Sequence, residues 1–238
     1  ARLHTHLAET HDEGAFCRAA FGMTPLDYLE ATGWLGPQTW IAHGIHFDAR
    51  EIARLGAAGV GIAHCPTSNL LLSSGICPAA ELEAAGCPVG VAVDGSSSQD
   101  SSNLMEEVRL AFLLARLRKG PALTHLDALR WATEGGARCL GRTDIGTLAP
   151  RRQADIAMFS LDELRFSGHG DPLAAIVLCG ANRADRVIVA GRTVVEDGRI
   201  PGLDLPALLT AHQAEADRLQ AHAAPLSHMS SEREPTHA

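Results

Sequence analysis

Residues 2–10, with the sequence RLHTHLAET, place two histidines and a glutamate within six positions. Side chains at positions i and i+2 of a β-strand point to the same face, so His4 and His6 would share one side of a sheet, with Glu9 just beyond the strand end. Imidazole and carboxylate groups are the usual protein ligands of hydrolytic metal ions, and carboxylates also move protons. This stretch therefore predicts part of a hydrolytic metal site.

Three further polar residues close apolar runs: His43 follows TWIA, His64 follows VGIA, and Asp94 follows PVGVAV. Counted from His6, these residues are 37, 21 and 30 positions apart, which is the spacing of βα units in a parallel sheet or barrel. Such folds gather their chemistry at the C-terminal ends of the strands. We therefore expect His6, His43 and Asp94 to lie together as candidate metal ligands, with Glu9 as a proton carrier.

The elements that must position these residues alternate along the chain. Helical patterns cover residues 12–33 (broken near Gly22 and Pro25), 49–59, 79–86 and 104–120. The apolar runs between them are nearly continuous, which indicates a sheet buried on both faces. After residue 142 the pattern changes to short β-rich runs separated by turn signals. The expected organisation is a partial barrel over 1–142, a small β-structure over 143–202, a terminal helix over 203–223 and a disordered tail over 224–238.

Composition narrows the class of protein. The 238 residues are 46% hydrophobic and 4% aromatic, which is typical of a globular protein. A net charge of −8 argues against nucleic acid or an anionic membrane surface as a partner and favours a small molecule. Six scattered cysteines without a C-x-x-C pair or a signal peptide indicate reduced thiols and a cytoplasmic location. No run approaches the roughly 20 apolar residues of a membrane span.

Several of these residues also have structural explanations. A single histidine is more often a hydrogen-bonded core or loop residue than a ligand. Glu9 could cap the next helix, and Asp94 precedes Gly95 in a dipeptide common in turns. Ser68 or Asn69 could cap a helix after His64.

The remaining candidates near the site have weaker claims. His4 is expected to pack deeper in the barrel than His6. His46 suits an exposed loop as well as it suits a ligand position. Cys65 lies beside a proline in an apolar setting, where a cysteine behaves as a small apolar residue rather than a nucleophile.

The segments HTHLAET, AHGIHFD, IAHCPTSN and VAVDGSSSQDSSN, in this order, resemble strands five to eight of the amidohydrolase superfamily, in its aminohydrolase branch. The resemblance extends to about residue 200. It implies an α/β fold, namely the C-terminal part of a (β/α)8 TIM-type barrel, followed by part of a small composite β-sandwich and a terminal helix.

The resemblance also implies roles for individual residues. His6 and Asp94 would bind one divalent metal ion, with zinc favoured and iron also suitable. Asp94 would accept the proton of the attacking water and His43 would polarise that water or the substrate. Glu9 would protonate the ring and the departing amine, so that Glu9 and His43 would both contact the substrate. The implied reaction is hydrolytic deamination of an oxidised purine such as 8-oxoguanine, with release of ammonia.

The chain departs from the family pattern in two ways. It has no counterpart of the first-strand H-x-H pair, of strands one to four or of the N-terminal half of the sandwich. The chain is therefore expected to be a fragment, inactive and weak in zinc binding by itself, and a homo-oligomer when complete. The second departure is Arg151, which stands where the sandwich pattern Gly-x-Leu-x-x-Gly-x-x-Ala-Asp has its second glycine.

Two alternative functions remain open from the sequence. One is removal of the ethylamino group of a triazine such as hydroxyatrazine, because residues that select the substrate would lie partly in the absent half. The other is a half-barrel without catalysis that dimerises or binds a partner through its exposed strand edges.

Overall fold

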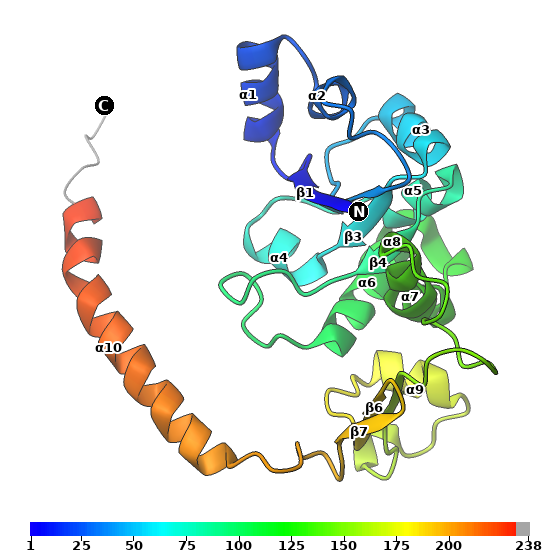
Figure 1. The fold of residues 1–238 in the computed structure, drawn as a ribbon, viewed down its shortest axis with the longest axis vertical. Helices are drawn as coiled ribbons and strands as arrows, with labels where there is room; N and C mark the ends of the chain where they lie inside the picture. The colour runs from blue at the N-terminus through cyan, green and yellow to red at the C-terminus, as the bar shows by residue number, and fades with distance from the viewer. Residues whose placement is uncertain (232–238) are drawn as a thin grey trace. The chain divides into compact units, whose positions relative to one another are not determined.

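The computed structural model describes residues 1–231, with side chains described for residues 1–223. The chain forms two compact units, residues 1–198 and a second unit from Arg199 onward (Figure 1). Within the second unit the main element is helix α10 (Leu205–Ser231). Residues 224–231, expected as part of a disordered tail, continue this helix, and residues 232–238 of that tail lie outside the described residues.

A parallel sheet organises the first unit. Its strands are β1 (Leu3–Leu7), β2 (Thr39–His43), β3 (Gly61–His64) and β4 (Val89–Val91), in the spatial order β1-β2-β3-β4. Every neighbouring pair is parallel. The α/β architecture with a parallel sheet, predicted from the apolar runs, is confirmed. Because the strands run the same way, their C-terminal ends meet at one edge of the sheet.

Helices connect the strands, and their ends follow from local sequence. They are α1 (His11–Phe21), α2 (Pro25–Ala31), α3 (Ala49–Ala58), α4 (Pro66–Leu71), α5 (Ala79–Ala85), α6 (Leu104–Lys119), α7 (His125–Arg130) and α8 (Gly136–Cys139), with a 3-10 turn η1 (Gly120–Ala122) and a π-helical turn η2 (Trp131–Gly135). Gly22 ends α1 in the left-handed conformation, and Pro25 opens α2. The predicted break in the first helical pattern is therefore confirmed.

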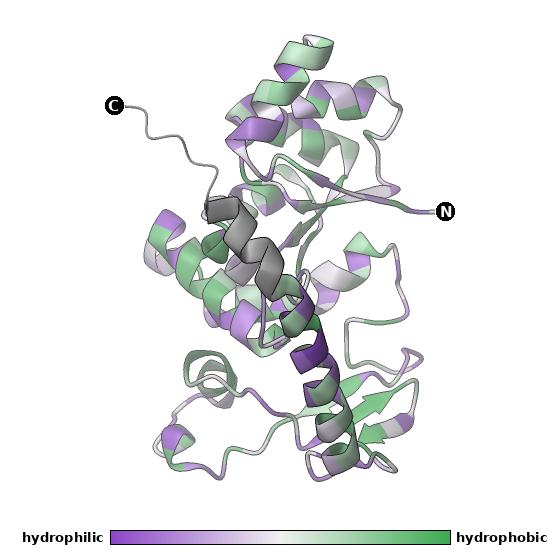
Figure 2. Ribbon diagram, turned by 90° about the vertical axis from the view of Figure 1, so that its left-hand side faces the viewer, coloured by the Kyte–Doolittle hydropathy of each residue, from purple (hydrophilic) through white to green (hydrophobic). Residues whose placement is uncertain are grey.

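The core lies between these helices and one face of the sheet. Ile41, Ile62 and Val89, one from each of three neighbouring strands, are at most 1% exposed, and Leu55 of α3 and Leu82 of α5 pack in the same cluster. In Figure 2 the helices of this unit carry both hydrophilic and hydrophobic residues along their length, as helices with one face against a sheet do. The sheet is thus held rigidly along its length, which fixes the positions of the strand ends.

A second, antiparallel sheet follows in the same unit. Its strands are β5 (Ile156–Met158), β6 (Arg186–Val189) and β7 (Arg192–Val195), in the order β5-β6-β7. A 3-10 turn η3 (Leu164–Phe166) and helix α9 (Pro172–Leu178) lie between β5 and β6. Short β-strands were predicted here, and the exact boundary near residue 142 stays a prediction. His125 of α7 lies 3.2 Å from the Asp171 carboxylate at the start of α9.

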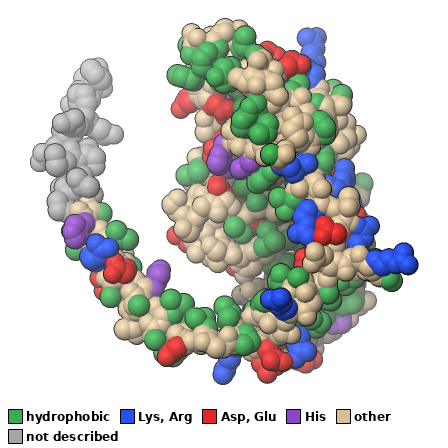
Figure 3. All heavy atoms as spheres, viewed as in Figure 1, with side chains coloured by type: hydrophobic (Ala, Val, Ile, Leu, Met, Phe, Trp, Pro, Cys, Tyr) green, Lys and Arg blue, Asp and Glu red, His purple; other side chains and the backbone are tan. Residues whose placement is uncertain are grey.

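Aromatic side chains of α1 and α2 contact one another on the surface. Phe16 and Phe21 of α1 are exposed, and Phe21 stacks on Tyr28 of α2 with ring centroids 4.4 Å apart. Figure 3 shows the hydrophobic side chains exposed over this end of the unit. The stack links α1 and α2 through their side chains.

No helix within the described part of the chain has the length and apolar character to span a membrane.

Candidate active site

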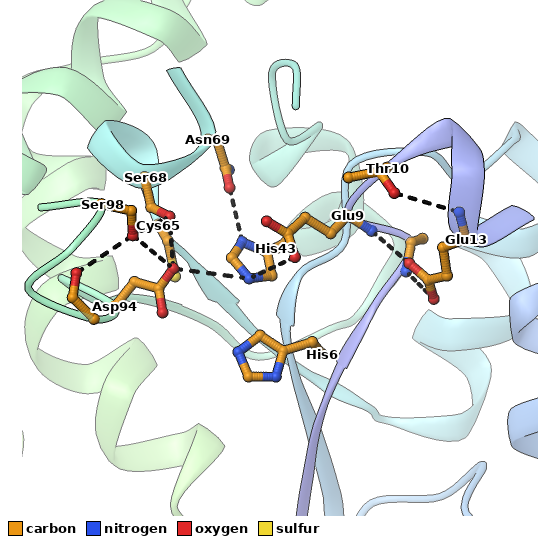
Figure 4. A network of polar contacts seen from close by, with 12 residues as sticks. His6, Glu9, Thr10, Glu13, His43, Cys65, Ser68, Asn69, Asp94 and Ser98 are labelled. Atoms are coloured by element: carbon orange, nitrogen blue, oxygen red, sulfur yellow. Dashed lines mark hydrogen bonds and ion pairs between the residues drawn. The ribbon is translucent and has the colours of Figure 1, made fainter. Parts of the chain in front are cut away.

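The C-terminal ends of the parallel strands bring together the residues singled out from the sequence. His6 lies in β1, His43 is the last residue of β2, and Asp94 follows β4. One potential ligand atom from each of these three side chains lies within 4.8 Å of the others. Figure 4 shows Glu9, which follows β1, directed toward the same space. The structure therefore places all four residues at one site.

The imidazole of His43 forms the centre of this arrangement. Its Nε2 atom lies 3.5 Å from Oε2 of Glu9 and 4.0 Å from Oδ2 of Asp94. The His43 side chain is 1% exposed, whereas the Glu9 and Asp94 side chains are 24% and 23% exposed. The two carboxylates are therefore accessible from solvent, whereas the imidazole is buried.

The donor set fits a divalent metal ion. Two imidazoles and a carboxylate are common ligands of zinc, and ligand atoms about 2 Å from an ion lie roughly 3–4 Å from one another. The donor atoms of His6, His43 and Asp94 lie at most 4.8 Å from one another, close to that spacing. Three protein donors also leave room for water on the ion.

The backbone turns sharply where the functional residues leave their strands. Ala8, His43 and Asp94 have φ angles of 52°, 69° and 66°, in the left-handed region that non-glycine residues seldom adopt. Such conformations cost of order 1–3 kcal/mol each and concentrate at functional sites. Two of these three residues, His43 and Asp94, are candidate functional residues, and Ala8 directly precedes Glu9.

Helix α4 supplies two contacts that the sequence did not suggest. It begins at Pro66 after Cys65, so Ser68 and Asn69 lie inside the helix, and the alternative in which one of them caps a helix is wrong. Asn69 Oδ1 lies 2.8 Å from Nδ1 of His43, and the Ser68 hydroxyl donates to Oδ2 of Asp94 at 2.6 Å. The sequence offered only two consecutive polar residues as a signal. In the structure both are buried, at 0% and 1% exposure.

Glu13 is the other functional contact that was missed. Its carboxylate accepts the backbone N–H groups of Ala8 and Glu9, both at 2.9 Å. Thr10 caps α1 by accepting from the Glu13 N–H, so the alternative role of Glu9 as the cap is wrong. The pattern Thr-x-x-Glu at residues 10–13 is the sequence signature of a capping box. Glu13 thus fixes the backbone of Glu9, and the side-chain carboxylate of Glu9 stays available for other contacts.

The charge states follow from these contacts. Burial by itself raises the pKa of Asp94, but the hydrogen bonds from Ser68 and the Gly95 backbone, with nearby His43 and His6, hold that pKa below its ordinary value. Burial, with a smaller contribution from His43, lowers the pKa of His64 to about 4. At neutral pH Asp94 is therefore an ionised carboxylate and His64 a neutral imidazole.

Cys65 shows the opposite effect of burial on an acid. Burial, followed by the charge of Asp94, raises the pKa of the Cys65 thiol to about 12. A thiol that stays protonated is a poor nucleophile. This agrees with the expectation that Cys65 acts as a small apolar residue.

The other histidines considered from the sequence, His4, His46 and His64, lie outside the group of His6, His43 and Asp94. His4 lies two residues before His6 in β1, stacked on Trp40 at 3.6 Å between ring centroids, and it is exposed rather than packed in a core. His46 Nε2 lies 2.9 Å from the Ser74 carbonyl. His64 ends β3 and is buried, and its Nδ1 atom has no hydrogen-bond partner among the residues that the structure describes.

A separate pocket of about 300 Å³ lies near α8. Its lining is mostly apolar, with Trp40, Ala63, Cys139 and Leu140 among the residues, and none of the four site residues contributes to it. Because it offers no titratable pair and no ligand set, the strand ends remain the candidate site.

Comparison with known proteins agrees with this geometry. Residues 1–194 match the Amidohydrolase family. The chain is 61% identical over 219 residues to 8-oxoguanine deaminase of Pseudomonas aeruginosa, covering 92% of this chain and 49% of that protein. It is 42% identical over 208 residues to hydroxydechloroatrazine ethylaminohydrolase of a Pseudomonas species, covering 85% of this chain and 43% of that protein. The chain thus spans about half the length of the curated relatives it matches.

Solved structures show the same relationship at the level of the fold. An adenosine deaminase from Xanthomonas campestris with bound zinc superposes with a TM-score of 0.88 at 31% identity, over 92% of this chain and 51% of that one. Atrazine chlorohydrolase from Arthrobacter aurescens complexed with zinc gives a TM-score of 0.84 at 36% identity, over 90% and 48% of the two chains. By its matched residues, its fold and the residues gathered at its strand ends, the chain belongs to the amidohydrolase family.

Proposed function

We propose that this chain supplies half of the barrel of a metal-dependent hydrolase that deaminates an oxidised purine such as 8-oxoguanine. The observation that carries the proposal is the meeting of His6, His43, Asp94 and Glu9 at one edge of a parallel sheet. The substrate class is supported by 61% identity to 8-oxoguanine deaminase. In this proposal β1–β4 correspond to strands five to eight of a (β/α)8 barrel, and β5–β7 to the C-terminal half of a composite sandwich.

His6 and Asp94 are the proposed protein ligands of one divalent ion, with zinc first and ferrous iron the alternative that suits the same donors. Such an ion, when bound, supplies Lewis acidity that makes water a better acid at neutral pH. Zinc is supported by the two zinc-containing relatives in the structural comparison.

The remaining work falls to side chains of this chain. Asp94 accepts the proton of the attacking water, and its lowered pKa keeps it ionised for that step. His43 holds the attacking water in place. Glu9, partly exposed and 3.5 Å from His43, delivers its proton to the ring nitrogen, then takes the proton of the newly attached hydroxyl group and passes it to the departing amine. The proton that Asp94 accepted returns to Glu9 before the next turnover. A C–O bond forms, the C–N bond breaks, and the amine leaves as ammonia.

The direct test is turnover of 8-oxoguanine by the native protein that contains this chain. Hydrolysis of the 2-amino group gives one ammonia and one urate for each substrate consumed, so both products are measured together. Hydroxyatrazine is tested in parallel, since release of ethylamine identifies the triazine activity instead. Adenosine serves as an unoxidised purine control. Equal release of ammonia and urate supports the proposal, whereas turnover of hydroxyatrazine alone, or of no substrate by a metal-loaded protein, overturns it.

A further inference from the structure

Helix α4 contacts two of the proposed functional side chains, Asp94 and His43. Consecutive residues Ser68 and Asn69 bind Asp94 and His43, which come from the ends of different strands. We propose that Asn69 is a positioning residue that fixes His43 in the Nδ1–H tautomer, so that the Nε2 lone pair faces the site. The inference rests on the proposed function for its purpose, but the contact itself can be measured without substrate or metal.

The chemistry of the contact selects the tautomer. A neutral imidazole has one N–H donor and one acceptor nitrogen, and the partner of one nitrogen determines the state of the other. The partner of His43 Nδ1 is the amide oxygen of Asn69, at 2.8 Å, which only accepts hydrogen bonds. The proton therefore resides on Nδ1. Nε2, which lies 3.5 Å from the Glu9 carboxylate and 4.0 Å from that of Asp94, keeps its lone pair for a water proton or an ion.

Burial makes this choice costly to reverse. His43 and Asn69 are each 1% exposed, so solvent does not offer a substitute partner for either side chain. In the amide orientation of the structure, a ring with its proton on Nε2 would leave two acceptors, Nδ1 and Oδ1, facing each other without a hydrogen between them, at a cost of about 1–3 kcal/mol for buried polar groups. The opposite tautomer would need the Asn69 amide to rotate, which would bring Nδ2, now unpaired among the described residues, to Nδ1 and leave Oδ1 unpaired in its place.

Asn69 is held in place by contacts that do not involve His43. Its backbone N–H donates to the Cys65 carbonyl, and its own carbonyl accepts from the Ser74 N–H at 2.8 Å. The start of α4 is anchored by Glu107, a fully buried carboxylate that accepts the Thr67 N–H at 2.9 Å. A side chain mounted on such a turn can impose an orientation on the imidazole instead of adapting to it.

The same carboxylate ties α4 to the loop after β4. Glu107 Oε1 accepts from the Gln99 side chain at 3.0 Å, and Gln99 lies five positions beyond Asp94. Ser68 donates to Asp94 from within α4. The turn that orients His43 is therefore fixed relative to Asp94 as well. Figure 4 shows the contacts of Ser68 with Asp94 and of Asn69 with His43.

The test is the ¹⁵N spectrum of the histidine rings in the native protein, freed of metal by a chelator at about pH 8 and labelled in the imidazole nitrogens. The His43 signals are assigned by their loss in His43→Gln. We expect a protonated, pyrrole-like Nδ1 and an unprotonated, pyridine-like Nε2. In Asn69→Leu, which removes the acceptor at similar size, the two signals should move toward each other as both tautomers become populated. Asn69→Asp keeps an acceptor at the same place and should restore the wild-type pattern.

A matched variant separates positioning from folding. Asn103 caps α6 by accepting the Met105 N–H, so Asn103→Ala should lower stability without changing the His43 signals. In the metal-loaded protein, Asn69→Leu should reduce kcat by about 10- to 100-fold, the usual effect of losing a residue that orients a functional imidazole.

Two results would overturn the inference: a wild-type His43 with its proton on Nε2, or an Asn69→Leu variant whose ring signals match the wild type. Neither depends on the reaction. Failure of wild-type protein to deaminate 8-oxoguanine would instead contradict the proposed function and leave the tautomer measurement standing.

Discussion

The carboxylate of Glu9 lies 3.5 Å from Nε2 of His43 across the neighbouring strand ends of β1 and β2. This separation exceeds the 2.7–3.2 Å of a normal nitrogen–oxygen hydrogen bond. Glu9 is thus close to the imidazole without being committed to it, and its backbone is held separately by Glu13. A side chain whose backbone is held in place and whose carboxylate can still move is suited to transfer protons.

Replacement of Glu9 by glutamine separates proton transfer from scaffolding. Glutamine keeps the size and some hydrogen bonding but cannot transfer a proton, so Glu9→Gln should lower kcat by about 10²-fold or more, the scale of general acid–base catalysis. The metal content of the protein should not change. His6→Ala is the matched variant, since loss of a proposed ligand should remove both metal and activity. Ammonia release and elemental analysis measure the two effects, and a Glu9→Gln enzyme with wild-type turnover would refute the shuttle role.

The placement of the site residues at strand ends could be predicted from the sequence, because every parallel βα unit brings the C-terminal end of its strand to the same edge of the sheet. His6, His43 and Asp94 each lie in or follow an apolar run, and the strands bring them to one edge whatever the details of packing. Helix limits such as Gly22 and Pro25 were also visible, because their backbone preferences are local.

The positioning contacts were not visible for a physical reason. Asn69 and His43 are 26 residues apart, and nothing local in the sequence records that α4 folds back over the end of β2. Ser and Asn after a proline are common helix caps, so local preference pointed to the wrong role for Ser68 and Asn69. Glu13 was missed because its Thr-x-x-Glu pattern indicates only the start of a helix, whereas its partners are the backbone N–H groups of Ala8 and Glu9, which precede that helix.

The buried His64 predicts a loss of stability in mild acid. Its folded-state pKa of about 4 lies below the ordinary 6.5, so between these values the unfolded chain binds a proton that the folded chain does not. The stabilising difference is complete above pH 6.5 and is lost as the pH falls toward 4. A shift of this size corresponds to about 3 kcal/mol across that window.

Urea unfolding of metal-free protein at several pH values from about 7 to 4.5 measures this slope. His64→Gln should flatten it, because glutamine does not titrate. His169→Gln, at an exposed histidine, should keep the wild-type slope. An unchanged slope in His64→Gln would show that other groups cause the acid sensitivity.

The substitution of arginine for the expected glycine at residue 151 has a backbone consequence. Arg151 has a φ of 68°, so it adopts the left-handed conformation that a glycine would adopt without strain. A left-handed conformation costs a side-chain-bearing residue about 1–2 kcal/mol, while a glycine loses about 0.5–1 kcal/mol more through backbone entropy on folding. Arg151→Gly should therefore raise the free energy of unfolding, by up to about 1 kcal/mol.

Arg152 is the matched control, since it is the adjacent exposed arginine and has no such φ. Arg152→Gly loses the same charge and gains the same backbone freedom in the unfolded chain, but relieves no left-handed strain, so it should be destabilising. Urea unfolding of the two variants at constant pH isolates the backbone effect, and an Arg151→Gly protein as unstable as Arg152→Gly would show that the turn tolerates arginine without strain.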